Sequence, residues 1–141
     1  MHHLRDGMRI LDLCTGSGCI LLSLLRYSNE CEGVGIDISG KALMTARENA
    51  DRLQLEAAFL EGDLFAPLAD FVSDRTTDRL FDMIVSNPPY IETAVIDTLM
   101  PEVRGHEPVS ALDGGDDGLC FYRRITAEAP AYMRKGAHLL F

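Results

Sequence analysis

The chain alternates short apolar runs with segments whose apolar residues recur at helical spacing. The runs cover residues 8–13, 32–37, 56–61, 81–86 and 137–141, and the periodic segments cover 18–27, 39–53 and 118–133. Strands that alternate with helices are typical of βαβ units, in which the strands lie parallel in one sheet. The pattern therefore predicts an α/β fold, with a doubly wound, Rossmann-like sheet that is mostly parallel.

The predicted helices carry local signals for their ends and faces. Ser39 is a typical N-cap for a helix that runs to about Leu53. Helical spacing assigns the inner face of this helix to Ala42, Ala46, Ala50 and Leu53. The segment 18–27 is nearly all apolar and is expected to be well buried, whereas Pro130 predicts a kink or an early end in the helix at 118–133.

A length of 141 residues predicts one domain, over residues 1–141. The chain stops within an apolar strand, which would leave a long unprotected sheet edge. We therefore expect a fragment, truncated after the fifth strand of its sheet. Polar residues at 73–79 and an acidic stretch at 101–118 predict loops. The run LDGGDDG (112–118) lacks calcium-loop spacing and predicts a turn and a helix start, with Asp116 or Asp117 near the helix N-terminus.

Residues 14–18 join the first predicted strand to the first helix and contain Gly16 and Gly18. Glycines let the backbone turn tightly and approach a ligand, and the unpaired N–H groups at a helix start favour a carboxylate or a phosphate. The third glycine of the nicotinamide-binding fingerprint is missing, because Leu21 occupies that position. By itself, this loop is equally consistent with an ordinary strand-to-helix turn.

Asp37 and Asp63 end the second and third predicted strands. In a doubly wound sheet, ligands bind outside the carboxyl ends of the strands, and a carboxylate beside the glycine loop binds ribose hydroxyls. The pattern favours that role for Asp37, which is compatible with a second role at the N-terminus of the next helix. Asp63 is either an acceptor for an adenine amino group or a turn residue after Gly62.

The fourth predicted strand leads directly into Asn87, Pro88, Pro89 and Tyr90. Proline has no backbone N–H and fixes φ, and a residue before proline is biased to extended geometry. The result is a stiff turn that presents carbonyl oxygens and one carboxamide. It suits a planar group with N–H donors of its own, such as an amide or an exocyclic amine. The simpler roles are a turn residue for Asn87 and packing under the loop for Tyr90.

Composition narrows the classes of partner. The chain has 13 basic and 22 acidic residues, for a net charge of −9, and it lacks a basic stripe, which argues against a nucleic-acid partner. No apolar run reaches the roughly 18 residues that span a bilayer, and no signal-peptide pattern is present, so we expect a soluble cytoplasmic protein. The four cysteines are expected to be reduced, and the four scattered histidines predict no metal site.

Six segments together carry a resemblance to a known family. They are LDLCTGSGC (11–19), GIDIS (35–39), ARENADRL (46–53), GDLF (62–65), FDMIVSNPPYI (81–91) and PEVRGHEPVSALDGGDDGLCFYRRI (101–125). The chain resembles class I S-adenosylmethionine-dependent methyltransferases, and more narrowly the HemK/PrmC family, which methylates a glutamine side chain in peptide chain release factors. The turn at 87–90 is shared with adenine-N6 methylating enzymes, whereas the segment at 101–125 is the narrower signature.

The resemblance implies S-adenosylmethionine as the cofactor, a release factor as the partner, and no metal. It assigns the methionine part of the cofactor to the glycine loop, the ribose to Asp37, and the adenine to Asp63 and Leu64. The implied cofactor-binding residues are Asp12, Thr15, Gly16, Ser17, Gly18, Cys19, Asp37, Asp63, Leu64 and Asn87. Two positions depart from the family pattern: Cys14 replaces a common glycine, and Leu64 replaces a frequent tryptophan. The family's N-terminal helical domain and final two strands are also absent from this sequence.

The implied reaction sets the roles of the turn. An amide nitrogen is a poor nucleophile because its lone pair is delocalised, so the site must orient the amide. We expect Asn87 Oδ1 and the Pro88 carbonyl each to accept one N–H of the substrate glutamine, which stabilises the positive charge that develops on nitrogen. Tyr90 is expected to stack on the amide, and Pro89 completes the substrate-binding turn. Two alternatives are amino-methylation of adenine or another nucleic-acid base, and an inactive cofactor-binding fragment.

Overall fold

The computed structural model describes residues 3–69, 80–96, 98 and 109–141. By its internal contacts the chain divides into two compact units. The first comprises Met1–Asn87 together with Ala129–Phe141, and the second comprises Pro88–Glu128. The predicted loop at 73–79, and the first part of the one at 101–118, lie outside the described residues.

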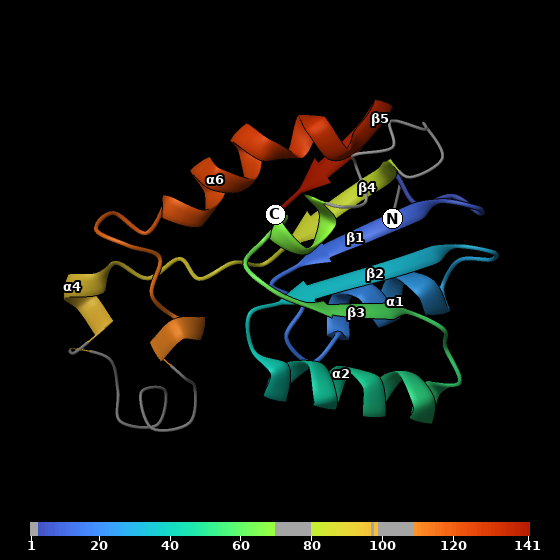
Figure 1. Cartoon of the computed structure of the whole chain (residues 1–141), viewed down its shortest axis with the longest axis horizontal. Coiled ribbons are helices and arrows are strands. Elements are labelled where there is room, and N and C mark those ends of the chain that lie inside the picture. The colour runs from blue at the N-terminus through green and yellow to red at the C-terminus, as the bar shows by residue number, and fades with distance from the viewer. Residues whose placement is uncertain (1–2, 70–79, 97, 99–108) are drawn as a thin grey trace. The chain divides into compact units, whose positions relative to one another are not determined.

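Among the described residues of the first unit, five strands form one sheet (Figure 1). They are β1 (Arg9–Leu13), β2 (Glu32–Asp37), β3 (Ala58–Glu61), β4 (Phe81–Ser86) and β5 (Met133–Leu140). Their order is β3-β2-β1-β4-β5, and each neighbouring pair is parallel. The chain builds outward from β1 to β3 and then continues on the other side of β1 with β4 and β5. This order confirms the predicted doubly wound parallel sheet, whose switch point lies between β1 and β4.

Helices α1 (Cys19–Arg26) and α2 (Gly40–Leu53) cover one face of this sheet (Figure 1). Their apolar side chains share a buried core with Ile10 of β1, Phe59 of β3 and Met83 of β4. Ser39 caps α2 as predicted, because its hydroxyl accepts a 3.2 Å hydrogen bond from the Ala42 N–H. The packing of both helices therefore fixes the two loops that precede them, at the carboxyl ends of β1 and β2.

The buried face of α2 differs in part from the predicted one. The helix buries Leu43, Ala46 and Ala50, whereas Ala42 is half-buried and Leu53 is exposed. Successive residues lie about 100° apart around a helix, so Leu43 and Ala42 flank Ala46 on opposite sides, and the stripe that meets the sheet is shifted toward Leu43. Leu53 is the last residue of α2. The choice of Ala42 and Leu53 was therefore wrong, and that of Ala46 and Ala50 is confirmed.

Helix α1 is less buried than its composition predicted. Leu21, Leu22 and Leu25 are buried, but Ile20 is exposed. A helix that lies on one face of a sheet presents only one stripe of residues to it. The apolar residues of α1 exceed that stripe, so composition alone overestimated its burial.

Strand β5 begins earlier than the predicted start at residue 137, because the preceding helix is shorter than expected. Helix α6 (Cys120–Glu128) ends before Pro130, in agreement with the predicted break, and the 3-10 turn η4 (Ala129–Tyr132) leads into β5 at Met133. The register of β5 against β4 shifts between Phe81 and Met83. Gly136, at φ 82°, lies within the part of β5 that the shift skips.

The described part of the second unit contains α4 (Thr93–Ile96), the 3-10 turn η3 (Val109–Ala111) and α6. An isolated parallel bridge joins Ile91 to Asp113. The predicted helix start is confirmed, because the Asp117 carboxylate accepts a 3.1 Å hydrogen bond from the Leu119 N–H just before α6 and pairs with Arg123. Within the part of the chain that the structure describes, no helix has the length and apolar character needed to cross a membrane.

Candidate functional site

The carboxyl ends of β1 and β4 meet at the switch point of the sheet. Leu13, the last residue of β1, pairs in register with Ser86, the last residue of β4. The buried Ser86 hydroxyl donates a 2.7 Å hydrogen bond to the Leu13 carbonyl. The next residues along the two strands are Cys14, which opens the glycine loop, and Asn87. The sheet therefore brings Asn87 to the glycine loop.

The glycine loop turns sharply before α1. The Gly18 N–H donates a 2.9 Å hydrogen bond to the Thr15 carbonyl, and Gly16 and Gly18 have φ values of 56° and 77°. A Cβ atom at Gly18 would press on side chains of α1 and α2, whereas one at Gly16 would meet no atom within 4 Å. Gly18 is the N-cap of α1 and supplies no side-chain acceptor to the first N–H groups of the helix. The loop thus leaves open space over Gly16, next to a helix N-terminus that favours negative groups.

Asp37 joins the glycine loop to the start of α2. One carboxylate oxygen accepts a 2.8 Å hydrogen bond from the Gly16 N–H, and the other accepts a 2.9 Å bond from the Ser39 N–H. The contact with Gly16 confirms the predicted position of Asp37 beside the loop. The bond to Ser39 matches the alternative role at the helix N-terminus. A carboxylate has about four acceptor positions, so each oxygen keeps one for a ligand hydroxyl.

Asp12 is a buried carboxylate with an unsatisfied oxygen. It is 1% exposed, and its Oδ2 accepts a 2.7 Å hydrogen bond from the Thr15 hydroxyl. Oδ1 makes no hydrogen bond of normal geometry to a described residue. The nearby backbone N–H of Leu21 lowers the pKa of the carboxyl group, but less than burial raises it. Burial raises the pKa of Asp12 to about 6, against the opposing effect of the Thr15 hydroxyl. Burying a carboxylate oxygen without a hydrogen bond costs folding free energy. Such an oxygen suits a ligand with a cationic N–H group, which would supply the missing hydrogen bond.

Three carboxylates of this region influence the thiol of Cys14. Burial raises the pKa of its thiol to about 12, and the charges of Asp37, Asp12 and Asp63 act in the same direction, whereas a hydrogen bond with Ser86 opposes them. These carboxylates come from the carboxyl ends of β1, β2 and β3. The charges of these three carboxylates therefore act on the surroundings of Cys14 and favour a positively charged ligand there.

Asp63 and Leu64 follow β3 and differ in exposure. The Gly62 N–H donates a 3.0 Å hydrogen bond to the Asp37 carbonyl, which ties this loop to the end of β2. Asp63 is exposed, whereas Leu64 is only 4% exposed and has φ 51°, in the left-handed region that leucine rarely adopts. The roles predicted for both residues at an adenine ring stay predictions, and the Leu64 side chain itself is buried.

The turn at 87–90 crosses the boundary between the two units. Asn87, the last residue of its segment in the first unit, is exposed, and its carboxamide makes no hydrogen bond to a described residue. It is therefore available to a ligand and does not cap its own backbone. Pro88, Pro89 and Tyr90 begin the second unit, where the Tyr90 side chain is 60% exposed. This exposure does not fit the simpler role of packing under the loop.

Sequence reasoning missed the residues that hold the glycine loop from outside. The Asn49 side chain in α2 donates a 3.0 Å hydrogen bond to the Ser17 carbonyl, and Arg52 donates in turn to Asn49. The Thr15 N–H donates to the Ile36 carbonyl of β2. The spacing of Asn49 and Arg52 on one helix face was visible in the sequence, but their distant partner was not. Cys19, a predicted site residue, is exposed at the start of α1.

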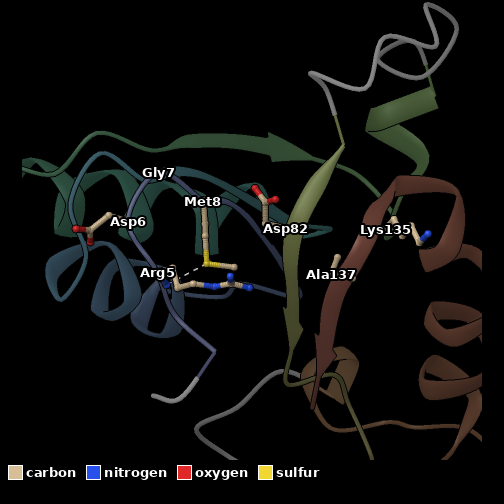
Figure 2. A pocket seen from close by; sticks show the side chains of 8 residues that line it. Arg5, Asp6, Gly7, Met8, Asp82, Lys135 and Ala137 are labelled. Atoms are coloured by element: carbon tan, nitrogen blue, oxygen red, sulfur yellow. Dashed lines mark hydrogen bonds between the residues drawn. The ribbon is translucent and has the colours of Figure 1, made fainter.

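A second feature lies at the opposite end of the sheet. A pocket of about 250 Å³ is bordered by the turn before β1, by Asp82 near the start of β4, and by the middle of β5 (Figure 2). Its lining residues are Arg5, Asp6, Gly7, Met8, Asp82, Lys135, Gly136 and Ala137. None of the predicted site residues is among them. The pocket is therefore separate from the candidate site at the carboxyl ends of the strands.

Comparison with known proteins agrees with this geometry. Residues 4–135 match a family model described as a methyltransferase domain. The chain therefore belongs to the methyltransferase domain family. It is similar to the release factor glutamine methyltransferases of Geobacter sulfurreducens, with 45% identity over 131 residues, and of Caulobacter vibrioides, with 51% identity over 129 residues. These alignments cover 93% and 90% of this chain, but only 43% and 42% of the two relatives. The chain thus spans about two fifths of the length of the curated relatives it matches.

A solved structure supports the fold independently. The crystal structure of a methyltransferase from Pyrococcus furiosus superimposes with a TM-score of 0.63 and 18% identity, over 97% of this chain and 56% of that one. At this level of identity the similarity extends to the fold alone. It agrees with the parallel sheet predicted from the sequence.

Proposed function

We propose that the protein containing this chain transfers a methyl group from S-adenosylmethionine to the side-chain amide nitrogen of a glutamine in peptide chain release factors. The observation that carries the proposal is the position of Asn87. Its carboxamide is exposed and makes no hydrogen bond to a described residue, and Asn87 comes directly after Ser86, which pairs with the last residue of β1 before the glycine loop. The similarity to two release factor glutamine methyltransferases favours this acceptor.

The residues around the glycine loop fit S-adenosylmethionine. When bound, this cofactor supplies a methyl group on a positively charged sulfur. The unsatisfied Oδ1 of Asp12 suits its ammonium group, with the loop from Thr15 to Cys19 around its methionine part. Asp37 keeps acceptor positions for the ribose hydroxyls, and Asp63 and Leu64 are assigned to the adenine. The negative charges of the three carboxylates near Cys14 favour the cofactor's positive charges.

Asn87 and Pro88 orient the acceptor amide. Asn87 Oδ1 and the Pro88 carbonyl each accept one N–H, so both amide hydrogens are held and the nitrogen lone pair is directed to one side. These acceptors stabilise the positive charge that develops on nitrogen during transfer, until the nitrogen releases one proton to solvent and becomes a neutral N-methyl amide. The ring of Tyr90 stacks on the planar amide, and Pro89 keeps the turn stiff and free of a competing N–H. Orientation supplies much of the rate gain, because an amide cannot readily be deprotonated near neutral pH.

The proposal includes a protein partner in the cytoplasm, where we expect the release factor and the enzyme to meet. Methylation of a nucleic-acid amine would use the same turn. The net charge of −9 and the absence of a basic stripe in the sequence favour the protein acceptor. A protein that binds the cofactor without transfer is the remaining alternative.

The test uses the full-length protein, a purified release factor and S-adenosylmethionine, with mass spectrometry of the release-factor peptides. We expect one added methyl group on one glutamine and none on adenine-containing DNA. Asn87→Ala is expected to reduce transfer at least 100-fold while cofactor affinity changes by less than about threefold, since Asn87 acts on the acceptor. Asn29→Ala is the matched control and should retain activity, because this exposed asparagine contacts Asp6 and Gly7 at the opposite end of the sheet from the site. Methylation of DNA instead of the release factor would overturn the proposal.

A further inference from the structure

The segment at 112–118 lies against the backbone that follows the Asn87–Tyr90 turn, within the second unit. We infer that residues 112–118, here termed the clasp, are positioning residues. They hold Tyr90 in place for methyl transfer to the acceptor amide. This inference rests on the proposed function of the turn. In this role the clasp contacts neither the acceptor amide nor the cofactor. It acts through the backbone of Tyr90 to Thr93.

The clasp forms a ladder of backbone hydrogen bonds with that stretch. The Ile91 N–H donates 2.9 Å to the Leu112 carbonyl, and the Gly114 N–H donates 2.7 Å back to the Ile91 carbonyl. The Thr93 N–H donates 3.0 Å to the Gly115 carbonyl. Neither Pro88 nor Pro89 has an N–H with which to anchor the turn. Among the described residues, the first backbone hydrogen bonds after the prolines are therefore those to the clasp.

The side chain of Asp113 adds two hydrogen bonds to this backbone ladder. Asp113 Oδ1 accepts a 2.7 Å hydrogen bond from the Thr93 hydroxyl and a 3.0 Å bond from the Gly115 N–H. These two bonds lower the pKa of the Asp113 carboxyl group, so it remains ionised near neutral pH. One carboxylate thus joins the strand-like stretch after Tyr90 to the centre of the clasp.

Two glycines allow the clasp to approach Tyr90 closely. A Cβ atom on Gly114 would lie 2.7 Å from the Tyr90 Cα and 2.8 Å from the Gly118 carbonyl oxygen. A Cβ atom on Gly118 would overlap the Tyr90 carbonyl oxygen. These neighbours are backbone atoms, so a change of side-chain rotamer cannot relieve the overlap. Any side chain at either position must move the Tyr90 backbone or open the clasp.

The chain contains a matched control for the strain of such a substitution. Gly118 and Gly7 both have φ 72°, where a side chain is disfavoured whatever the space. A Cβ atom at Gly7 would meet nothing within 4 Å, whereas the one at Gly118 meets Tyr90. Gly7→Ala and Gly118→Ala therefore share the backbone strain, and only the second displaces Tyr90.

The experiment compares these two variants in the full-length protein. Gly118→Ala is expected to lower kcat about 10- to 100-fold, as expected for a displaced reacting geometry, with the Kd for S-adenosylmethionine within about threefold of the wild type. Gly7→Ala should keep the wild-type kcat. Because Gly118→Ala can impair folding, the milder pair Asp113→Ala and Asp113→Asn is measured as well. We expect a lower kcat for the first and recovery in the second, which keeps an acceptor for Thr93.

A second readout separates this inference from the proposed function. Amide hydrogen exchange at Ile91 and Thr93 should be slow in the wild type and at least tenfold faster in Asp113→Ala, with unchanged exchange in β1 and β4. This holds even if the wild type methylates no release factor, a result that would remove the proposed function alone. Equal kcat in Gly118→Ala and Gly7→Ala overturns the inference, as does exchange at Ile91 that Asp113→Ala leaves unchanged.

Discussion

The Asp37 carboxylate accepts a 2.8 Å hydrogen bond from the Gly16 backbone N–H and so joins the end of β2 to the glycine loop. The same carboxylate accepts from the Ser39 N–H at the start of α2. Two elements that bracket the proposed cofactor therefore depend on one side chain. Its two remaining acceptor positions are the ones we assign to ribose hydroxyls.

Replacing this carboxylate tests that assignment. Asp37→Asn removes the charge and turns one acceptor into a donor, which opposes either the Gly16 or the Ser39 N–H. We expect the affinity for S-adenosylmethionine to fall about 10- to 100-fold, equivalent to about 1.4–2.7 kcal/mol, by isothermal titration calorimetry. Asp51→Asn, on an exposed position of α2, is the control and should bind normally. Unchanged affinity in Asp37→Asn would exclude Asp37 from the ribose site.

Asp12 is expected to make the stability of the ligand-free protein depend on pH. Because its pKa is raised from 3.8 to about 6 on folding, the folded chain holds this proton more tightly than the unfolded chain. The free energy of unfolding should therefore decrease as the pH rises from about 4 to about 6, and then stay level. The shift corresponds to at most about 3 kcal/mol. Asp12→Asn should raise the melting temperature at pH 7.5 and leave it nearly unchanged at pH 4.

The same substitution should weaken cofactor binding. The ionised carboxylate is the form that attracts a cationic group, so wild-type affinity for S-adenosylmethionine should decrease as the pH falls through about 6, where Asp12 takes up its proton. In Asp12→Asn the affinity should be lower at pH 7.5 and flat across this range. A variant that loses stability at pH 7.5 yet binds the cofactor like the wild type would contradict both parts of the prediction.

The thiol of Cys14 should react slowly with alkylating reagents. Only the thiolate is nucleophilic, and a pKa raised from 9.0 to about 12 leaves very little thiolate at pH 8. We expect iodoacetamide to modify Cys14 at least about 100-fold more slowly than the exposed Cys120, as followed by peptide mass spectrometry. Equal rates would mean that Cys14 lies outside the buried, acidic surroundings described above.

Asp82 is expected to secure the irregular pairing of β5. Its carboxylate accepts a 2.8 Å hydrogen bond from the Arg9 N–H of β1 and 3.1 Å bonds from the Arg134 guanidinium of β5. Asp82→Ala should lower the free energy of unfolding by about 1–2 kcal/mol, since it leaves the Arg9 N–H without this acceptor. Denaturant unfolding measures the loss. Asp6→Ala, an exposed aspartate near the same pocket, is the control and should cost less.

The sequence was sufficient for the parts of the fold that depend on local signals. Ser39 caps α2 because an N-cap hydroxyl reaches only three residues ahead. The approach of Asp37 to Gly16 followed from the general geometry of parallel sheets. The position of Asn87 directly after β4 followed from the apolar run at 81–86.

The errors and omissions all concern contacts between distant residues. The inner face of α2 depends on the rotation with which the helix meets the sheet, so Leu43 could not be chosen over Ala42 from spacing alone. The early start of β5 at Met133 depends on its pairing with Phe81. The burial of Asp12, and with it the pKa of that residue, requires the complete core. The contact of Gly118 with Tyr90 joins positions that no short sequence window contains.

That contact makes the four-residue turn and the clasp a single module for protein engineering. Grafting Asn87 to Tyr90 alone into another methyltransferase scaffold would transplant the proposed acceptor-binding groups without the backbone contacts that support Tyr90. Chimeras intended to change acceptor preference should therefore exchange Tyr90–Thr93 and residues 112–118 together, and libraries that randomise the turn should keep both Gly114 and Gly118 constant.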